Sequence, residues 1–289
     1  MKKCLFASDI VILTYIAIIS SLVLIFHSDI PNWFVYIAYH LSIIAMISLI
    51  IYAYNKYDSR IWQVARYWYP VIVILSAFRE LHHLIPCINP FEPGYYNDKI
   101  LYYIDRRLFS GITDVIESMA SSTLSDILMI CYLSYFAMPI VLGISLYIKG
   151  EHTKFKNALC GLLIGWFISY IGYIVVPAVG PHVAMDTSRT AVLDGAFIAK
   201  SIYHSLIRLE LRMADAFPSG HTLIAILVLY YSWKYYRNVF WYILPFAIGL
   251  VISTVYLRYH YVVDLAVAIM LVPPTIWLER FTSKLLPYK

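Results

Sequence analysis

The sequence predicts an all-α membrane protein, a polytopic helical bundle of about eight transmembrane helices with an interfacial amphipathic helix. The first observation is composition: 61% of the 289 residues are hydrophobic, 13% are charged, and the mean hydropathy is +0.72. Such a chain lacks the polar surface that a soluble domain needs to cover its core. The second is that the apolar residues form long runs, which leave no room for a soluble domain. Residues 1–289 are therefore expected to form a single integral membrane domain.

Eight apolar runs each hold roughly the 17 to 25 residues that cross about 30 Å of hydrocarbon. The first is expected to stay as a helix, because no small-residue cleavage site follows it and Pro31 leads straight into the next run. The third is the least regular, since its apolar part stops at Phe78. The predicted spans are Ile10–Phe26, Trp33–Tyr54, Trp68–Leu84, Ile127–Ile148, Ala158–Val176, Pro218–Trp233, Val239–Tyr256 and Val262–Leu278.

The distribution of charge predicts that both chain ends are cytoplasmic. With eight spans, more than half of the 22 Lys and Arg residues fall on the inner side, where basic residues in short loops set the orientation of membrane proteins. Removing the third span would move the loop Lys149–Lys156 to the outside, so the charge pattern supports that span. The net charge of +5 is then an inner-face bias and implies no nucleic-acid partner.

Two predicted outer loops are long, Pro86–Asp126 and Pro177–Phe217. Apolar positions in the first repeat at intervals of four, which is typical of an amphipathic helix lying on the membrane interface. Two roles are open for this helix: a lid that admits lipid, or a helix that only rests on the head groups. The repeating positions are Ile104, Leu108, Ile112 and Ile116.

The pentapeptide FPSGH stands at Phe217–His221, at the predicted outer start of a span. Proline is favoured at the first position of a helix, so Pro218 predicts a helix start with Ser219, Gly220 and His221 in its first turn. Free backbone N–H groups and the helix dipole attract phosphate at such a place. The motif therefore predicts a phosphate-binding turn that carries a proton donor.

A second histidine lies in the segment RYHYVVD, Arg258–Asp264. His260 and Asp264 stand one helical turn apart, where a carboxylate can fix the imidazole tautomer and stabilise its charge. Taken alone, His260 could be an interfacial histidine and Asp264 a capping carboxylate. However, an ionisable residue within a span is costly unless it has a partner, and His260 is one. With His221 on the same membrane face, the pair predicts phosphoryl transfer through a histidine.

The predicted topology brings three distant segments to the outer face. VVPAVGPH ends the fifth span, FPSGH opens the sixth and RYH opens the eighth. These segments can share one pocket, so residues 175–271 are expected to contain the catalytic motifs. The site is then extracytoplasmic, on a periplasmic or lumenal face.

At these residues the chain resembles the type 2 phosphatidic acid phosphatase superfamily, whose signature joins Pro-Ser-Gly-His to a later His with an Asp four residues on. The resemblance implies that His260 attacks phosphorus to give a phosphohistidine, that Asp264 orients it, and that His221 protonates the leaving oxygen. Ser219 and Gly220 would hold the equatorial phosphate oxygens. The implied substrate is a lipid phosphate or phospholipid, and we expect neither a metal nor another cofactor.

Two departures from the superfamily's phosphatase pattern indicate which branch of the superfamily the chain resembles. The phosphatase pattern has an Arg six residues before the nucleophile, where this chain has Thr254, and its first motif, a Lys followed seven residues later by Arg-Pro, is absent. DRRLF, LSYFAMP, VVPAVGPH, AFPSGHT and YLRYHYVVD together resemble the inositol phosphorylceramide synthase-like branch. The basic ligands of the phosphate are then open; the candidates are Arg258 first, followed by Arg106, Arg107, Arg79 and His182.

The sequence thus predicts a membrane enzyme that moves a phosphoryl or phosphorylated head group from a lipid donor. If water resolves the intermediate, the enzyme is a lipid phosphate phosphatase acting on phosphatidate or a polyprenyl phosphate. If an alcohol or lipid acceptor does, it is a phosphotransferase, which Thr254 favours. A transporter would predict broken helices in matched halves, and the sequence has no internal repeat.

Two polar pairs stand at the end of the third span, and for both a structural role is favoured over a role in the site. Arg79 and Glu80 are predicted to form a salt bridge with each other or within a network. His82 and His83 have no carboxylate or cysteine at ligand spacing, so a metal site is not expected there.

Overall fold

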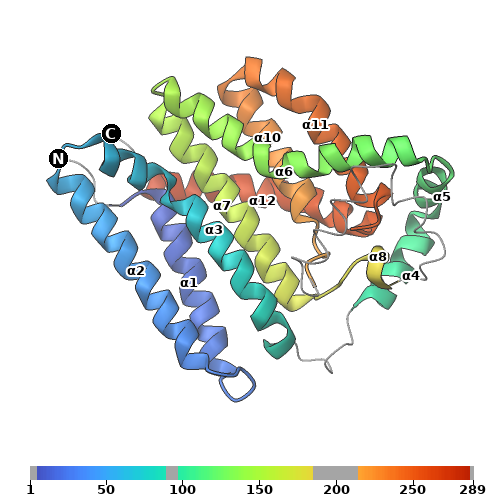
Figure 1. Ribbon diagram of the computed structural model, residues 1–289, viewed down its shortest axis with the longest axis horizontal. Coiled ribbons are helices and arrows are strands. Elements are labelled where there is room, and N and C mark those ends of the chain that lie inside the picture. The colour runs from blue at the N-terminus through green and yellow to red at the C-terminus, as the bar shows by residue number, and fades with distance from the viewer. Residues whose placement is uncertain (1–4, 89–96, 185–213, 287–289) are drawn as a thin grey trace.

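The computed structural model describes residues 5–88, 97–184 and 214–286, and the fold of these ranges is helical (Figure 1). The described residues contain no strand, only an isolated β-bridge between Ala178 and Asp215. The predicted all-α bundle is confirmed. The centre of the predicted outer loop Pro177–Phe217, residues 185–213, lies outside the described residues.

Seven described helices are long and apolar enough to cross a membrane. The third is one continuous helix of 29 residues, so the polar stretch after Phe78 still belongs to the span. The seven helices are α1 (Ala7–Ile25), α2 (Trp33–Lys56), α3 (Arg60–Ile88), α6 (Ser122–Ile148), α7 (His152–Val175), α11 (Arg237–Tyr256) and α12 (Val262–Leu285).

The predicted span Pro218–Trp233 corresponds to α10 (Gly220–Tyr235), which has 16 residues. At about 1.5 Å per residue it is about 24 Å long, shorter than the hydrocarbon core of a bilayer. α10 packs against α6, α7, α11 and α12, and more than half of its residues are buried. It is therefore the central helix of the C-terminal part, where neighbouring helices cover most of its length.

Two groups of helices share α7. α1, α2, α3 and α7 lie side by side (Figure 1), while α6, α10, α11 and α12 form the second group. Glycines on α7 allow α10 to approach closely: a Cβ at Gly161 would lie 1.9 Å from the Tyr231 hydroxyl, and one at Gly165 would lie 2.6 Å from Leu227. Small residues at helix interfaces serve this purpose in membrane bundles.

The predicted interfacial helix is in fact two short helices, α4 (Asp98–Leu108) and α5 (Ser110–Ser118). The backbone of Phe109 is not helical, with φ −130° and ψ 12°, and the following Ser110 and Gly111 are weak helix formers. The prediction of one continuous helix through Ile104 and Ile116 is therefore wrong. The outward side of the pair is apolar, as the prediction required; its exposed side chains include Leu108, Ile112 and Val115.

Arg79 and Glu80 do not pair with each other. Arg79 is exposed, whereas Glu80 is buried and its Oε1 lies 2.8 Å from Nε2 of His40 on α2. Nδ1 of His40 lies 2.8 Å from the hydroxyl of Ser20 on α1. The predicted network is therefore confirmed for Glu80, which it joins to α1 and α2, whereas exposed Arg79 is not among its members.

Candidate active site

Ser219 is the N-cap of α10, so the helix begins two residues later than Pro218 predicts. The Ser219 hydroxyl accepts the Thr222 N–H at 3.3 Å and donates to the Thr222 hydroxyl at 3.1 Å. Serine is a strong N-cap residue, and this preference sets the helix start rather than the proline. Because Ser219 is fully buried, its hydroxyl is part of the cap.

Gly220, the first residue of α10, lies directly against α7. A Cβ at this position would be 2.3 Å from the Tyr173 hydroxyl oxygen, so a larger residue would displace Tyr173 or the first turn. Glycine here lets the first turn of α10 pack directly against α7, and this contact sets the position of His221 in that turn.

His221 and His260 face each other, with 3.3 Å between Nδ1 of His221 and Nε2 of His260. Nδ1 of His260 lies 2.6 Å from the Ala216 carbonyl oxygen. A carbonyl can only accept, so this nitrogen carries the proton and Nε2 presents its lone pair. Nδ1 of His221 is then the donor to His260. The nitrogen expected to attack phosphorus therefore faces the expected acid.

Asp264 has both of the roles that the sequence left open. In the first turn of α12, its Oδ2 accepts the Tyr261 N–H at 2.8 Å, which is a capping contact. The same oxygen lies 3.5 Å from Nδ1 of His260. Asp264 is fully buried, and its Oδ1 has no hydrogen-bond partner among the described residues. Thus Ala216 makes the shorter contact with His260, and Asp264 supplies the nearby negative charge.

Backbone hydrogen bonds join the segments that the sequence predicted to meet. The Ala216 N–H donates to the Ala178 carbonyl at 2.9 Å, and the Ser219 N–H donates to the Asp264 carbonyl at 3.2 Å. The His260 N–H donates to the Thr254 carbonyl at 2.9 Å. The end of α7, the start of α10 and the start of α12 therefore form one hydrogen-bonded unit around His260.

Aromatic side chains of α6 hold the His221 ring. Tyr132 stacks on His221 with 4.6 Å between ring centroids, and on Tyr259 at the same distance. The Tyr135 ring lies 4.3 Å from His221, and its hydroxyl accepts the Trp166 indole N–H at 2.6 Å. Sequence reasoning missed both tyrosines. Their spacing of three, at and just before LSYFAMP, is the one signal that they share a helix face.

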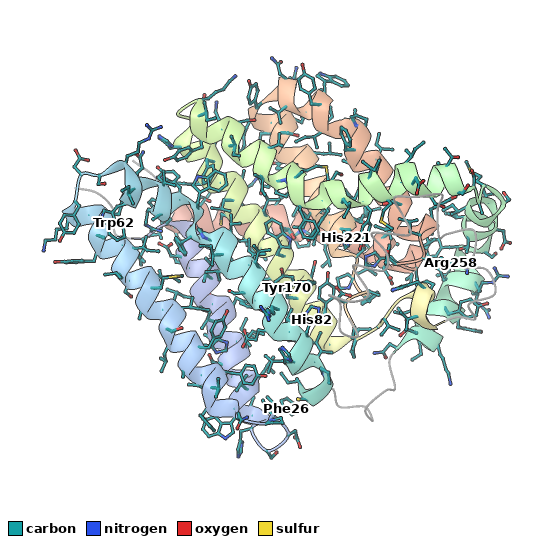
Figure 2. The ribbon with its side chains drawn as sticks, in the orientation of Figure 1. Phe26, Trp62, His82, Tyr170, His221 and Arg258 are labelled. Carbon is teal, nitrogen blue, oxygen red and sulfur yellow. The ribbon has the colours of Figure 1, made fainter. Side chains whose placement is uncertain are left out.

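Arg258 and His182 lie on the side of the site near α8 (Pro181–Ala184). Arg258 has a left-handed backbone, φ 62°, and its carbonyl accepts the His182 N–H at 2.9 Å. Figure 2 shows His221 inside the bundle and Arg258 toward α4 and α8. Burial lowers the pKa of His182 to about 4, and the nearby His260 acts in the same direction. His182 is therefore neutral at pH 7.

The other predicted phosphate ligands lie on exposed surfaces. Arg106 pairs with Asp114 of α5 at 2.9 Å, and both side chains are largely exposed. Arg107 donates to the Tyr103 hydroxyl at 3.1 Å and is also exposed. Arg79 is exposed on α3. Of the candidate basic ligands, Arg258 and His182 are the two whose backbones join at the segment that carries His260.

Two buried carboxylates of α4 were not predicted. Asp98 accepts hydrogen bonds from the N–H groups of Val179 and Gly180, and Asp105 accepts one from the Val263 N–H at 2.9 Å. Burial raises the pKa of both carboxyl groups, and their hydrogen bonds act in the opposite direction. These residues touch the segments that carry the histidines without touching the histidines themselves.

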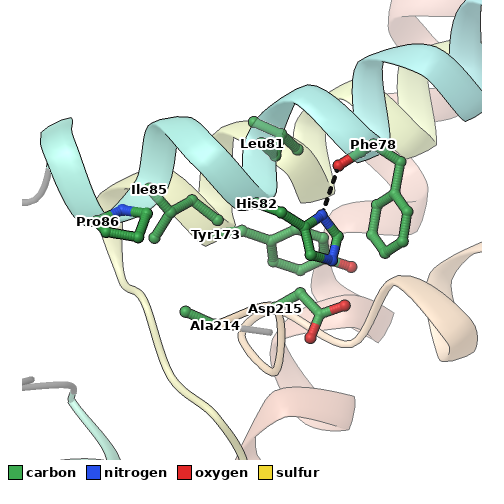
Figure 3. A pocket seen from close by; sticks show the side chains of 8 residues that line it. All are labelled: Phe78, Leu81, His82, Ile85, Pro86, Tyr173, Ala214 and Asp215. Carbon is green, nitrogen blue, oxygen red and sulfur yellow. Dashed lines mark hydrogen bonds between the residues drawn. The ribbon is translucent and has the colours of Figure 1, made fainter. Parts of the chain in front are cut away.

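A third unpredicted carboxylate, Asp215, directly precedes Ala216. It lines a small cavity together with His82 and Tyr173 (Figure 3). The volume open to the centre of a water molecule in this cavity is about 10 Å³. Nδ1 of His82 lies 2.8 Å from the Phe78 carbonyl, and Nε2 has no partner among the described residues. Burial raises the pKa of Asp215, whereas His260 and His82 act to lower it. Asp215 thus interacts electrostatically with both His260 and His82.

Comparison with known families gives a match for the C-terminal two thirds of the chain. A family model described as the PAP2 superfamily matches residues 99–278. The match includes His221, His260 and Asp264, and it leaves α1 to α3 outside. It supports the superfamily that the motifs resemble and does not distinguish a branch within it. Comparison with curated proteins and with solved structures found no match.

Proposed function

Because the chain belongs to the PAP2 superfamily, we propose that it is an integral membrane lipid phosphotransferase. It moves a phosphoryl or phosphorylated head group from a lipid donor to an alcohol or lipid acceptor through a phosphohistidine on His260. The observation that carries this proposal is the 3.3 Å approach of His221 Nδ1 to His260 Nε2. Superfamily membership alone indicates a phosphatase-type enzyme of lipid phosphates.

In the first step His260 is the nucleophile. Its Nε2 forms the bond to phosphorus while the bond from phosphorus to the leaving oxygen breaks. The Nδ1 proton stays on the hydrogen bond to the Ala216 carbonyl. Positive charge develops on the ring, and Asp264, 3.5 Å from Nδ1, stabilises it.

His221 acts first as an acid and then as a base. Two facing imidazolium rings would repel each other, so at most one of the two histidines is protonated at a time. The negative charge of a donor phosphate that enters between them favours the protonated form of His221. His221 gives its Nδ1 proton to the leaving oxygen. It then takes the proton of the acceptor alcohol, whose oxygen attacks phosphorus and displaces Nε2 of His260. Both histidines return to their starting states.

The choice of transfer over hydrolysis rests on the charge available to the phosphate. Thr254 stands where the phosphatase pattern has Arg; it is fully buried, and its hydroxyl donates to the Val251 carbonyl at 2.7 Å. Of the candidate basic ligands near the histidines, Arg258 is charged and His182 is neutral. A guanidinium at position 254 would hold a dianionic monoester, whereas a phosphodiester has one negative charge and needs less. This supports a diester donor, and with it the inositol phosphorylceramide synthase-like branch.

The phosphate contacts follow from the same geometry. Since the Ser219 hydroxyl is used by the helix cap, Ser219 and Gly220 would act by shaping the first turn of α10 around the phosphate. N–H groups of that turn, together with the helix dipole, would face the equatorial oxygens. Arg258 would compensate the charge from the opposite side.

Products distinguish transfer from hydrolysis. Purified protein is incubated with a labelled phosphodiester lipid and a panel of alcohols and lipid acceptors, and the products are identified by mass spectrometry. Transfer yields diacylglycerol and a head-group-labelled acceptor, and Arg258→Ala loses both. Release of inorganic phosphate from phosphatidate or a polyprenyl phosphate, at a rate that no acceptor diverts, would contradict transfer and support the phosphatase.

The proposal places the site on the outer face with both termini in the cytoplasm. In a variant whose native cysteines are replaced by alanine, Ser118→Cys on α5 should react with a membrane-impermeant maleimide in intact cells. Thr153→Cys, at the opposite end of α7 from the site, should react only after lysis. Both positions are exposed, so a reversed pattern would place the site on the cytoplasmic face.

A further inference from the structure

The orientation of α4 is the reverse of a water-facing amphipathic helix. Its buried face consists of Asp98, Leu101 and Asp105, which are at most 6% exposed. Its outward face carries large apolar side chains more than 60% exposed. They are Ile100, Tyr103 and Leu108. In water, burying two carboxylates and exposing these side chains would cost free energy twice. At a lipid interface the second cost disappears, and hydrogen bonds offset the first.

Asp98 uses both of its oxygens as acceptors. Oδ2 accepts the Val179 N–H at 3.1 Å, and Oδ1 accepts the Gly180 N–H at 2.9 Å and the Tyr261 hydroxyl at 3.1 Å. The chain at Gly180 is left-handed, with φ +85°, and a Cβ there would lie 2.3 Å from the Tyr259 carbonyl oxygen. Asp98 therefore holds a tight turn directly against the residue before His260.

The segment that Asp98 holds contacts both sides of the nucleophile. On one side, the Ala178 carbonyl accepts the N–H of Ala216, whose own carbonyl fixes Nδ1 of His260. On the other side, the His182 N–H binds the Arg258 carbonyl. A shift of residues 178–182 would thus move the acceptor of His260 and the turn that carries it.

We propose that Asp98 is a positioning residue: it fixes residues 178–182, and through them His260, while the outward face of α4 lies in the outer-leaflet lipid. The proposal rests on His260 as the nucleophile. Asp98 touches no reacting atom, so its removal should lower the rate of the chemical step by more than it weakens the binding of the donor, which Arg258 on the same turn contacts in the proposed function.

Asp98→Asn and Asp105→Asn form a matched pair, because they make the same chemical change on the same buried face. In D98N the amide NH₂ must meet one of two backbone N–H donors, whichever way it is turned, so one donor loses its acceptor. In D105N the amide oxygen still accepts the Val263 N–H. Its NH₂ faces the Thr113 hydroxyl, which lies 3.3 Å from Oδ2 and can accept. D114N, on the exposed side of α5, is the control, and we expect it to change neither kcat nor the unfolding temperature.

The test measures three quantities for these variants: hydrogen exchange of peptides covering residues 177–184, kcat and KM for the lipid donor, and the unfolding temperature in detergent. For D98N we expect faster exchange in that segment, a kcat lower by about 10- to 100-fold, and a KM that rises by a clearly smaller factor. D105N should lose less than D98N in kcat, at a similar unfolding temperature.

Two results would overturn the proposal. If D98N exchanges faster but keeps the kcat of D114N, Asp98 only stabilises the turn. If D98N and D105N lose kcat equally and in proportion to their unfolding temperatures, the effect is general destabilisation. A fully active His260→Ala variant would instead remove the proposed function, and the hydrogen-exchange comparison would still show whether Asp98 holds the segment.

Discussion

The described part of the chain contains two buried histidine–carboxylate pairs, which differ in how many of their polar atoms lack a protein partner. Among α1 to α3, His40 lies 2.8 Å from Glu80 and 2.8 Å from Ser20, so both ring nitrogens are satisfied. In the C-terminal part, Nδ1 of His260 lies near Ala216 and Asp264, but Nε2 faces a second imidazole. One carboxylate oxygen of Asp264 has no partner among the described residues.

This difference supports the proposal that the His40 cluster stabilises the fold and the His260 cluster is reactive. Within a bilayer, an ionisable group costs several kcal/mol unless it has a partner, and the His40 cluster meets that requirement within the protein. In the His260 cluster, by contrast, the facing nitrogens of His221 and His260 contact only each other at 3.3 Å, and Oδ1 of Asp264 has no partner among the described residues. The family match agrees with the division, because it starts at residue 99 and excludes the His40 cluster.

The largest effect is expected from His260→Ala. Removing the nitrogen that forms the bond to phosphorus should lower kcat by at least about 10⁴-fold, while the protein elutes as the wild type does in size exclusion. His221→Ala should lose about 10²- to 10⁴-fold, because it removes the proton donor. A head-group transfer assay on purified variants measures both. Turnover by His260→Ala above a few per cent of wild type would contradict the assignment.

Asp264→Asn should have the next largest effect, a loss of about 10²-fold in kcat. The Ala216 carbonyl still holds Nδ1, so the tautomer survives, but the charge that stabilises the imidazolium is lost. The unfolding temperature should stay close to that of the wild type, because an amide oxygen can still accept the Tyr261 N–H. A kcat within 3-fold of wild type would show that Ala216 alone suffices.

The next effect is on stability: His182 makes the unfolding free energy depend on pH. Its native pKa of about 4 lies below the ordinary value near 6.5, so the unfolded chain binds a proton first as the pH falls. The contribution of neutral His182 is complete above about pH 6.5 and is lost as the pH falls toward 4. Wild type should therefore lose about 2 to 3 kcal/mol more unfolding free energy than His182→Gln between pH 7.5 and 4.5. Urea unfolding in detergent at several pH values measures the unfolding free energy of both proteins. If this free energy falls with pH equally in wild type and His182→Gln, the prediction is wrong.

The smallest effect on activity is expected from Glu80→Gln, which makes the same charge removal in the other cluster. The amide oxygen can still accept from His40, but the charge of Glu80 is lost. The unfolding free energy should therefore fall only moderately, by about 1 to 3 kcal/mol. The kcat should remain within about 2-fold of wild type. If Glu80→Gln lowers kcat as much as Asp264→Asn does, the two clusters are not separate in function.

Sequence reasoning reached the side chains whose chemistry has a recognisable type and spacing. His221, His260 and Asp264 were predicted in this way, and the structure places them together. The long apolar helices were predicted from the same kind of pattern and are confirmed. The Ala216 carbonyl was not, because every residue carries a carbonyl and only the packed turn selects this one. Tyr132 was missed for a related reason: its stack on His221 exists only once α6 packs against α10.

The start of α10 and the orientation of α4 show a second limit. Pro218 and Ser219 each favour a helix start, and the choice between them depends on the buried contacts of Ser219. On α4, apolar spacing predicted an interfacial helix but not that Asp98 and Asp105 turn into the protein. That orientation depends on backbone N–H donors from segments far away in sequence.

The central claim is that phosphorus becomes bonded to Nε2 of His260. His221→Ala, which slows protonation of the leaving oxygen, is mixed with a labelled donor that has a good leaving group, quenched rapidly in base, and digested for mass spectrometry. We predict an acid-labile, base-stable label on the peptide that contains His260, and none in the variant that also carries His260→Ala. A label that persists without His260, or that lies on another residue, would contradict the account.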